Sequence, residues 1–343
     1  MSDGLEPPSG RPERFTISAD RYRTVTVFAL VMIAAIVVTG AAVRLSGSGM
    51  GCDTWPNCAD GELIRFGNTN QTIEQVNRLF TGMVSFSVIA AVLGSLRRRP
   101  YRRDLVWWSL ALVGGVLGQI VLGGITVLVH LHPAAVAGHF VLSMILLVAA
   151  VNLVWKARHG TSPRRAVVGA VDVNLSRVAA VCATAMMVTG PIVTGSGPHA
   201  GDAEARRFGF FFPDVVRIHS INMWIFLVVV VVLLARLARW GAPSAVLQRG
   251  SLLLLAIVVQ GGIGYTQYEL GIPPWVVLAH IAGATTVVGL MVWFHLGLFD
   301  TDGPPTAGAA TIGTTSDEAV SDEAVSSAPR TSEPVAPLSV ETA

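Results

Sequence analysis

Long apolar stretches recur along the 343-residue chain, and Arg is mostly confined to short clusters between them. Each stretch holds close to 20 residues, the length of helix that crosses about 30 Å of hydrocarbon. The pattern predicts an all-α polytopic membrane protein with eight transmembrane helices. We place these spans at residues 24–43, 75–95, 105–128, 135–155, 175–195, 215–236, 250–268 and 275–297.

Composition agrees with a lipid environment. The chain is 52% hydrophobic and 13% charged, whereas roughly a quarter of the residues of a soluble globular protein are charged. The formal net charge of +2 is too small to suggest a nucleic-acid partner. We therefore expect membrane lipid, and no nucleic acid, around this protein.

The loops alternate between Arg-rich and Arg-poor. Basic residues gather before the first span and after the second, fourth and sixth spans. The positive-inside rule then places both termini in the cytoplasm of a multi-pass protein of the cell membrane. The loops expected to face outside are 44–74, 129–134, 196–214 and 269–274.

The sequence also repeats itself, at offsets of 138 to 150 residues. Val38-Thr39-Gly40 recurs as Val188-Thr189-Gly190, and Gly123-Gly124-Ile125 recurs as Gly261-Gly262-Ile263. Four spans per repeat is an even number, so both halves enter the membrane in the same direction. This predicts two four-helix bundles related by a pseudo-two-fold axis along the membrane normal.

The predicted organisation has five parts. Two four-helix halves are flanked and joined by cytoplasmic segments, and the last segment repeats Ser-Asp-Glu-Ala-Val among Thr, Ser, Pro and Ala. Such a composition cannot bury enough apolar surface to fold, so we expect a disordered tail. The parts are an N-terminal segment 1–23, a first half 24–155, a linker 156–174, a second half 175–297 and a tail 298–343.

Three histidines lie four to six residues from the outer end of a predicted span: His139, His219 and His280. His139 matches His280 in the repeat, and Asn77 stands at the position that matches His219. A single intramembrane His is commonly a hydrogen-bonded helix contact. Two imidazoles at one depth in one bundle instead favour axial ligation of a haem iron by His219 and His280. No third ligand for zinc is evident at that depth.

Glu74 lies one helical turn on the outer side of Asn77, on the same helix face. It is either an interfacial carboxylate favoured by the helix dipole or a functional group. The matching residue in the second half is Val216. This asymmetry suggests that the first half is specialised for chemistry and the second half for holding a cofactor.

Cys52 and Cys58 lie six residues apart in a loop expected outside. That compartment favours oxidation, and a short Pro-containing loop can bring the two sulfurs together, although two unpaired thiols remain an alternative. Arg44 and Arg78, near the same face, could pair with haem propionates or extend to lipid headgroups.

In combination, these motifs resemble the haem A synthase family over about residues 24 to 297. The motifs are Gly47-Ser48-Gly49-Met50-Gly51-Cys52, Trp55-Pro56-Asn57-Cys58, Glu74 with Asn77-Arg78-Leu79, Leu122-Gly123-Gly124 before His139, Thr194-Gly195-Ser196-Gly197-Pro198-His199-Ala200-Gly201-Asp202, His219, and Pro273-Pro274-Trp275 before His280.

The resemblance implies an oxidoreductase that acts on a CH or CH2 group, converting a methyl substituent of haem O to the formyl group of haem A, the haem of aa3-type cytochrome oxidase. It implies haem B as the cofactor, held by His219 and His280. It further implies that His139 lies at the substrate haem O site with Asn77 beside it, that Glu74 is the catalytic carboxylate, and that the two loop cysteines form a disulfide.

The chain departs from the family at Asn77, where members with a full set of ligands carry His. A five-coordinate haem on His139, with an open face beside Asn77, would still suit oxidation. The rival interpretations are a dihaem b-type electron carrier that leaves haem unmodified, and a transporter. Candidate partners are haem O synthase, assembly factors of cytochrome oxidase and a second copy of the chain, among which the sequence does not choose.

Overall fold

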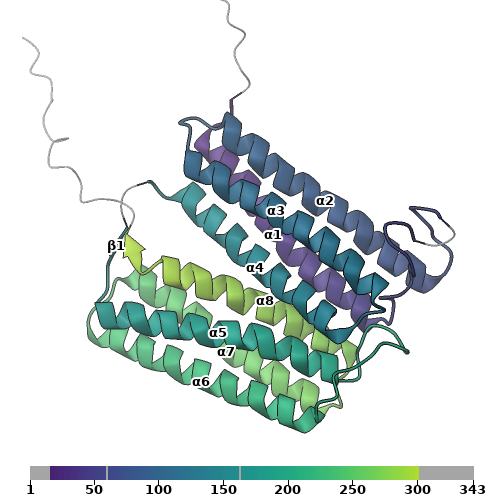
Figure 1. The fold of residues 1–343 in the computed structure, drawn as a ribbon. Helices are drawn as coiled ribbons and strands as arrows, with labels where there is room; N and C mark the ends of the chain where they lie inside the picture. The colour runs from purple at the N-terminus through teal and green to yellow at the C-terminus, as the bar shows by residue number, and fades with distance from the viewer. Residues whose placement is uncertain (1–15, 59–60, 162–163, 301–343) are drawn as a thin grey trace, which may run out of the picture. The chain divides into compact units, whose positions relative to one another are not determined.

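The computed structural model describes residues 16–58, 61–161 and 164–300. In this part of the chain, eight helices are long and apolar enough to cross a membrane, which confirms the predicted fold class. The helices are α1 (Ala19–Leu45), α2 (Thr69–Arg97), α3 (Arg103–Leu128), α4 (Pro133–Arg158), α5 (Ala170–Ser196), α6 (Phe212–Arg239), α7 (Ser244–Glu269) and α8 (Pro274–Leu296) (Figure 1).

The helices form two bundles with matching neighbours. In the first bundle α1 packs on α2 and α4, and α3 packs on the same two helices; α5 to α8 repeat this arrangement. Between the bundles α4 packs on α8, while α1 packs on α8 and α4 packs on α5 (Figure 1). Adding four to each helix number maps this contact set onto itself, as the predicted pseudo-two-fold relation requires.

The helices extend beyond the predicted apolar spans because their polar ends are capped. Ser18 accepts a hydrogen bond from the backbone of Arg21 at the start of α1, and Asn68 and Gln71 form a capping box that starts α2 at Thr69. The longest helix, α2, has 29 residues, or about 43 Å at 1.5 Å per residue. That length matches a bilayer with its headgroup regions.

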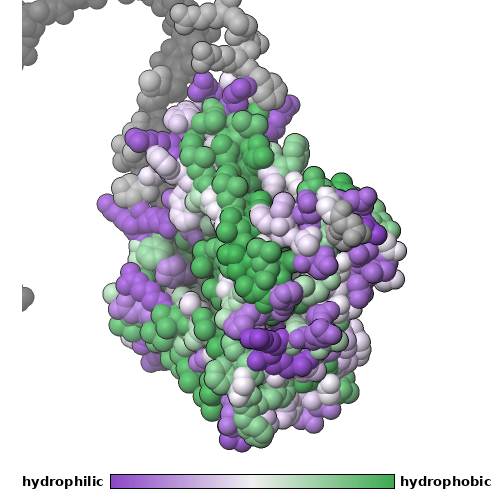
Figure 2. Space-filling view, turned by 45° about the vertical axis from the view of Figure 1, so that its right-hand side comes forward, coloured by the Kyte–Doolittle hydropathy of each residue, from purple (hydrophilic) through white to green (hydrophobic). Residues whose placement is uncertain are grey.

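Apolar side chains serve both as core and as lipid-facing surface. One core cluster surrounds Leu112 and Met144 in the first bundle, and another surrounds Leu253 and Phe294 in the second. Large apolar residues such as Phe86 remain exposed along the helices. Figure 2 shows this apolar surface in green, with polar residues in purple toward its margins. An apolar exterior is what lipid as solvent requires.

Arginines join helices within and between the bundles at the end where α1 begins. Arg236 Nε lies 2.9 Å from the buried Asp172 carboxylate, which joins α6 to α5. The Arg249 guanidinium of α7 lies 5.3 Å from the ring of Trp155 and 5.4 Å from the ring of Trp293, both within cation–π range. Trp155 belongs to α4 in the first half and Trp293 to α8 in the second half.

The same end contains a short ladder that the sequence did not predict. Strand β1 (Arg165–Ala166) pairs with β2 (Phe299–Asp300) in antiparallel register. The linker expected at 156–174 therefore contributes a strand, and the first residues of the expected tail are ordered against it. The rest of that tail, from residue 301, lies outside the described residues.

Candidate functional site

The loops at the opposite end join the two halves. The Arg44 guanidinium donates to the carbonyls of His199, at 2.9 Å, and Thr194, at 3.2 Å. His199 Nε2 in turn lies 2.8 Å from the carbonyl oxygen of Ile272, in the loop before α8. Arg44 thus bonds to the second half rather than extending to headgroups, and His199 links two loops. These contacts join the end of α1 to the loops that precede α6 and α8.

His219 of α6 and His280 of α8 face one another in the second bundle. Their ring centroids are 6.4 Å apart and the ring planes meet at 62°. Metal–imidazole nitrogen bonds are about 2 Å long, so one metal atom between two rings needs roughly this separation. The spacing therefore fits the axial ligation of a haem iron.

Each half-buried ring is placed by a glycine on the neighbouring helix. A Cβ added at Gly190 of α5 would lie 3.5 Å from Cε1 of His219, and one at Gly264 of α7 would lie 3.1 Å from Cε1 of His280. The absence of a side chain at these positions lets the imidazole edge lie against the helix backbone. No hydrogen bond within the described part of the chain engages Nε2 of either ring, so this nitrogen is left for a ligand.

The first bundle repeats this arrangement around His139. A Cβ added at Gly123 of α3 would lie 3.3 Å from Cε1 of His139. Gln119, one turn earlier on α3, donates to the His139 carbonyl at 3.3 Å. In the second bundle Gln260 donates to the His280 carbonyl at 2.7 Å. The two bundles thus place equivalent histidines with equivalent glutamines.

These contacts correct the repeat register of α3 and α7. The sequence comparison paired Gly123 with Gly261, but a Cβ at Gly261 would contact Met223 rather than a histidine. The structure pairs Gly123 with Gly264 and Gln119 with Gln260, at the same offset as His139 and His280. The pair Gly261-Gly262 lies less than one turn before Gly264, so a comparison of motifs easily takes it for the counterpart of Gly123-Gly124.

Asn77 occupies the place of His219 in the first bundle. Its Oδ1 accepts a hydrogen bond from Thr39 Oγ1 at 2.9 Å, and Thr189 contacts His219 Nδ1 at the same distance. Gly40, the counterpart of Gly190, has no atom within 4 Å of a Cβ position. The shorter asparagine side chain therefore leaves open space where the second bundle has an imidazole edge.

The loop after α1 is closed by a Cys52–Cys58 disulfide, and both cysteines are fully buried. Its Trp55 ring lies against α3, where a Cβ at Gly124 would approach it to 2.7 Å. Gly124 adjoins the glycine beside His139. The disulfide loop thus covers the outer side of the first-bundle site.

Glu74 and Arg78 of α2 hold that loop. The Glu74 carboxylate accepts the Cys52 N–H at 2.8 Å through Oε2, while Oε1 pairs with Arg78 at 2.6 Å. Arg78 also donates to the carbonyls of Thr54, Pro56 and Asn57. Arg78 therefore bonds to the loop, and the carboxylate lies between helix and loop, one turn above Asn77.

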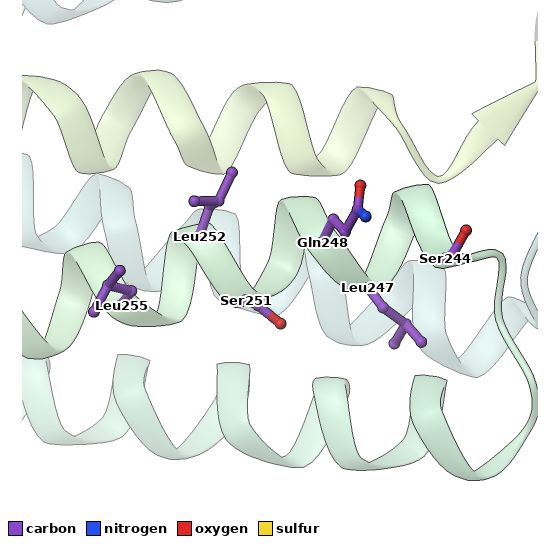
Figure 3. A pocket seen from close by; sticks show the side chains of 6 residues that line it. All are labelled: Ser244, Leu247, Gln248, Ser251, Leu252 and Leu255. Atoms are coloured by element: carbon purple, nitrogen blue, oxygen red, sulfur yellow. The ribbon is translucent and has the colours of Figure 1, made fainter.

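Two hollows differ in their relation to these residues. A cavity of about 230 Å³ is lined by Thr189, Ile192, Phe210, Val215 and Ile218, and Thr189 in turn contacts His219. The other is a hollow along α7, lined by residues between Ser244 and Leu255 (Figure 3). His139, His219 and His280 are not among these residues. This hollow is lined by one helix, and we assign it no part in the site.

Fold and site define a class: a multi-pass membrane protein with a paired-imidazole site in one half and a matching histidine–asparagine site in the other. The sequence model of the COX15-CtaA family, described as cytochrome oxidase assembly protein, matches residues 23–71 and 64–201, more than half of the chain. The protein belongs to this family.

Curated relatives named heme A synthase share part of the chain. The protein of Alkalihalophilus pseudofirmus is 30% identical over 135 residues, covering 39% of this chain and 45% of the relative. That of Lysinibacillus sphaericus is 31% identical over 129 residues, covering 37% and 42%. That of Listeria welshimeri is 28% identical over 131 residues, covering 37% and 43%. The matches thus span less than half of each relative.

We expect Arg78→Lys to release the disulfide loop. Lysine cannot reproduce the forked contacts with the carboxylate and three carbonyls, and hydrogen bonds to charged groups contribute about 1.5–3 kcal/mol each. Since both half-cystines are buried, a reductant reaches them when the loop opens. The rate of thiol labelling under mild reductant should rise about tenfold or more. Arg217→Lys, in an exposed pair on α6, is the control, and equal rates in both variants would contradict the assignment.

Proposed function

We propose that this protein is a haem A synthase, an oxidoreductase that converts a methyl group of haem O to the formyl group of haem A for aa3-type cytochrome oxidase. The observation that carries the proposal is the pair of facing imidazoles in the second bundle, together with a matched site in the first bundle that keeps one imidazole and opens the other side. The relatives' name, heme A synthase, agrees with it.

In this proposal the second bundle holds the cofactor. His219 and His280 ligate haem B, and Gly190 and Gly264 allow both rings to face each other at the observed separation. A bound haem B supplies one-electron transfer. The protein's part is to fix the two rings and to shield them between α5, α6, α7 and α8.

The first bundle binds the substrate. His139 holds haem O from one side, and Asn77 offers an amide on the open side beside Gly40. The disulfide loop, with Trp55 against α3, excludes water from the outer face. Glu74 is the proposed catalytic carboxylate, and its contact with the Cys52 N–H also couples it to the loop. Successive hydroxylation of a methyl group held here to the formyl level would take one oxygen atom from water and release four protons and four electrons, so the reaction would need an external electron acceptor.

The proposal extends to location. We infer a cell-membrane protein with both termini in the cytoplasm, since the Arg-rich loops lie at the end where α1 begins. The first-bundle site would then face the outer leaflet. Haem O synthase and assembly factors of cytochrome oxidase are the partners that this activity would need in the same membrane.

Expression together with a haem O source, followed by acid extraction and chromatography of the membrane haems, tests the function. Haem A should be present when the intact protein is expressed and should be missing with an empty vector, and haem B should copurify. A folded protein that retains haem B and leaves haem O unconsumed would instead be an electron carrier, and the proposal would be wrong.

Glu74→Gln should lower haem A production about 100-fold or more, the usual contribution of a proton-transferring group, while haem O accumulates. The amide can still accept the Cys52 N–H. If the loss arises from loop release, thiol labelling should rise as in Arg78→Lys; an unchanged labelling rate assigns the carboxylate to chemistry. Glu62→Gln, an exposed carboxylate in the same loop, is the control. Normal haem A levels in Glu74→Gln would remove the residue from the site.

Asn77→His should close the open side of the first-bundle site. Thr39 and Gly40 stand where Thr189 and Gly190 accommodate His219, so the new ring has both an acceptor and room. We expect a second low-spin bis-imidazole haem signal in visible and electron paramagnetic resonance spectra, because the new ring supplies a second axial ligand opposite His139. An unchanged spectrum with haem O bound would refute the proposed pairing of Asn77 with His139.

A further inference from the structure

Thr189 of α5 contacts the His219 ring through its hydroxyl. Thr189 Oγ1 lies 2.9 Å from His219 Nδ1 and also 2.9 Å from the carbonyl oxygen of Ala185, one turn earlier on α5. Threonine commonly bonds the carbonyl four residues back within a helix. The hydroxyl therefore has two neighbours and one hydrogen to share between them.

The two neighbours decide which nitrogen carries the proton. The Ala185 carbonyl can accept a hydrogen bond but cannot donate one, so it takes the Thr189 hydrogen. The Thr189 oxygen then accepts from His219 Nδ1–H, and both contacts are satisfied. With the hydrogen on Nε2 instead, the single hydroxyl hydrogen would face two acceptors. The arrangement thus fixes the tautomer whose Nε2 lone pair is free.

The other two ligand candidates lack such a partner. Nδ1 of His139 and Nδ1 of His280 are buried and have no hydrogen-bond partner among the described residues. Thr39, the counterpart of Thr189, lies 2.9 Å from Asn77 Oδ1 and 3.4 Å from the Ile36 carbonyl. The shorter contact takes its hydrogen, so Thr39 donates where Thr189 accepts.

We propose that Thr189 is a positioning residue that holds His219 in the Nδ1–H tautomer, directs Nε2 toward the haem iron and tunes the electron affinity of that haem. The inference rests on the proposed haem B site. A hydrogen bond accepted from Nδ1–H makes the opposite nitrogen a stronger electron donor. It therefore stabilises the oxidised iron and lowers the midpoint potential of the cofactor in the second bundle.

Thr189→Val keeps the shape of the side chain and removes its hydroxyl, and Thr189→Ser keeps the hydroxyl. Thr184→Val is the matched control, because exposed Thr184 on the same helix bonds the Ala180 carbonyl in the same way. The full-length protein with haem B bound is titrated potentiometrically, and its retained haem is measured. Histidine labelled with 15N in the haem-free protein reports the His219 tautomer by nuclear magnetic resonance, assigned by the loss of the signal in His219→Asn.

Thr189→Val should raise the midpoint potential, changing the ratio of oxidised to reduced haem at fixed potential about tenfold, which is about 59 mV for one electron. Haem affinity should fall about 10- to 100-fold. Thr189→Ser should restore both values, Thr184→Val should change neither, and the Nδ1–H signal of His219 should disappear in Thr189→Val.

Each other outcome overturns the inference. A Thr189→Val protein with unchanged potential and affinity, equal losses in Thr184→Val, or failure of Thr189→Ser to restore the values would show that the hydroxyl does not act through His219. If the wild-type protein binds no haem B, the proposed function fails. The tautomer signal of the haem-free protein then still tests the contact between Thr189 and His219.

Discussion

An imidazole in the apolar part of a membrane must be held by its neighbours, because lipid offers it no hydrogen bonds. The structure holds three such rings by the same packing contact, and a hydroxyl also contacts the ring of His219. His139, His219 and His280 each lie against a glycine of the preceding helix. The remaining architecture depends on these close contacts, since each sets how near two helices approach at the depth where a cofactor would be bound.

The asymmetry between the bundles arises from one side chain. Where the second bundle has a ring between α5 and α6, the first has Asn77, and Gly40 has open space. The disulfide loop, Glu74 and Arg78 lie over this opened side, and Val216 stands in the place of the carboxylate in the second bundle. A closed site suits electron transfer, and an open, covered site suits oxidation of a bound molecule.

The sequence predicted the eight helices and the facing rings of His219 and His280. Both predictions use local information: the length of each apolar span and the position of a histidine within its span. Sequence reasoning did not find Thr189 or Gln260, although the threonine lies in a repeated motif and the glutamine interrupts an apolar span, because their roles depend on which helix faces which. The same limit explains the shifted register at Gly261 and the β1–β2 ladder. Arg78 could not be assigned to the disulfide loop until the loop's path over α2 was known.

The contact between α4 and α8 has a further consequence. It maps onto itself when the halves are exchanged, and the contact of α1 with α8 exchanges with that of α5 with α4. This is the geometry of an isologous interface between identical subunits. A single four-helix unit with these surfaces would dimerise through its last helix. Gene duplication and fusion of such a unit would free one copy to lose an imidazole while the other kept it.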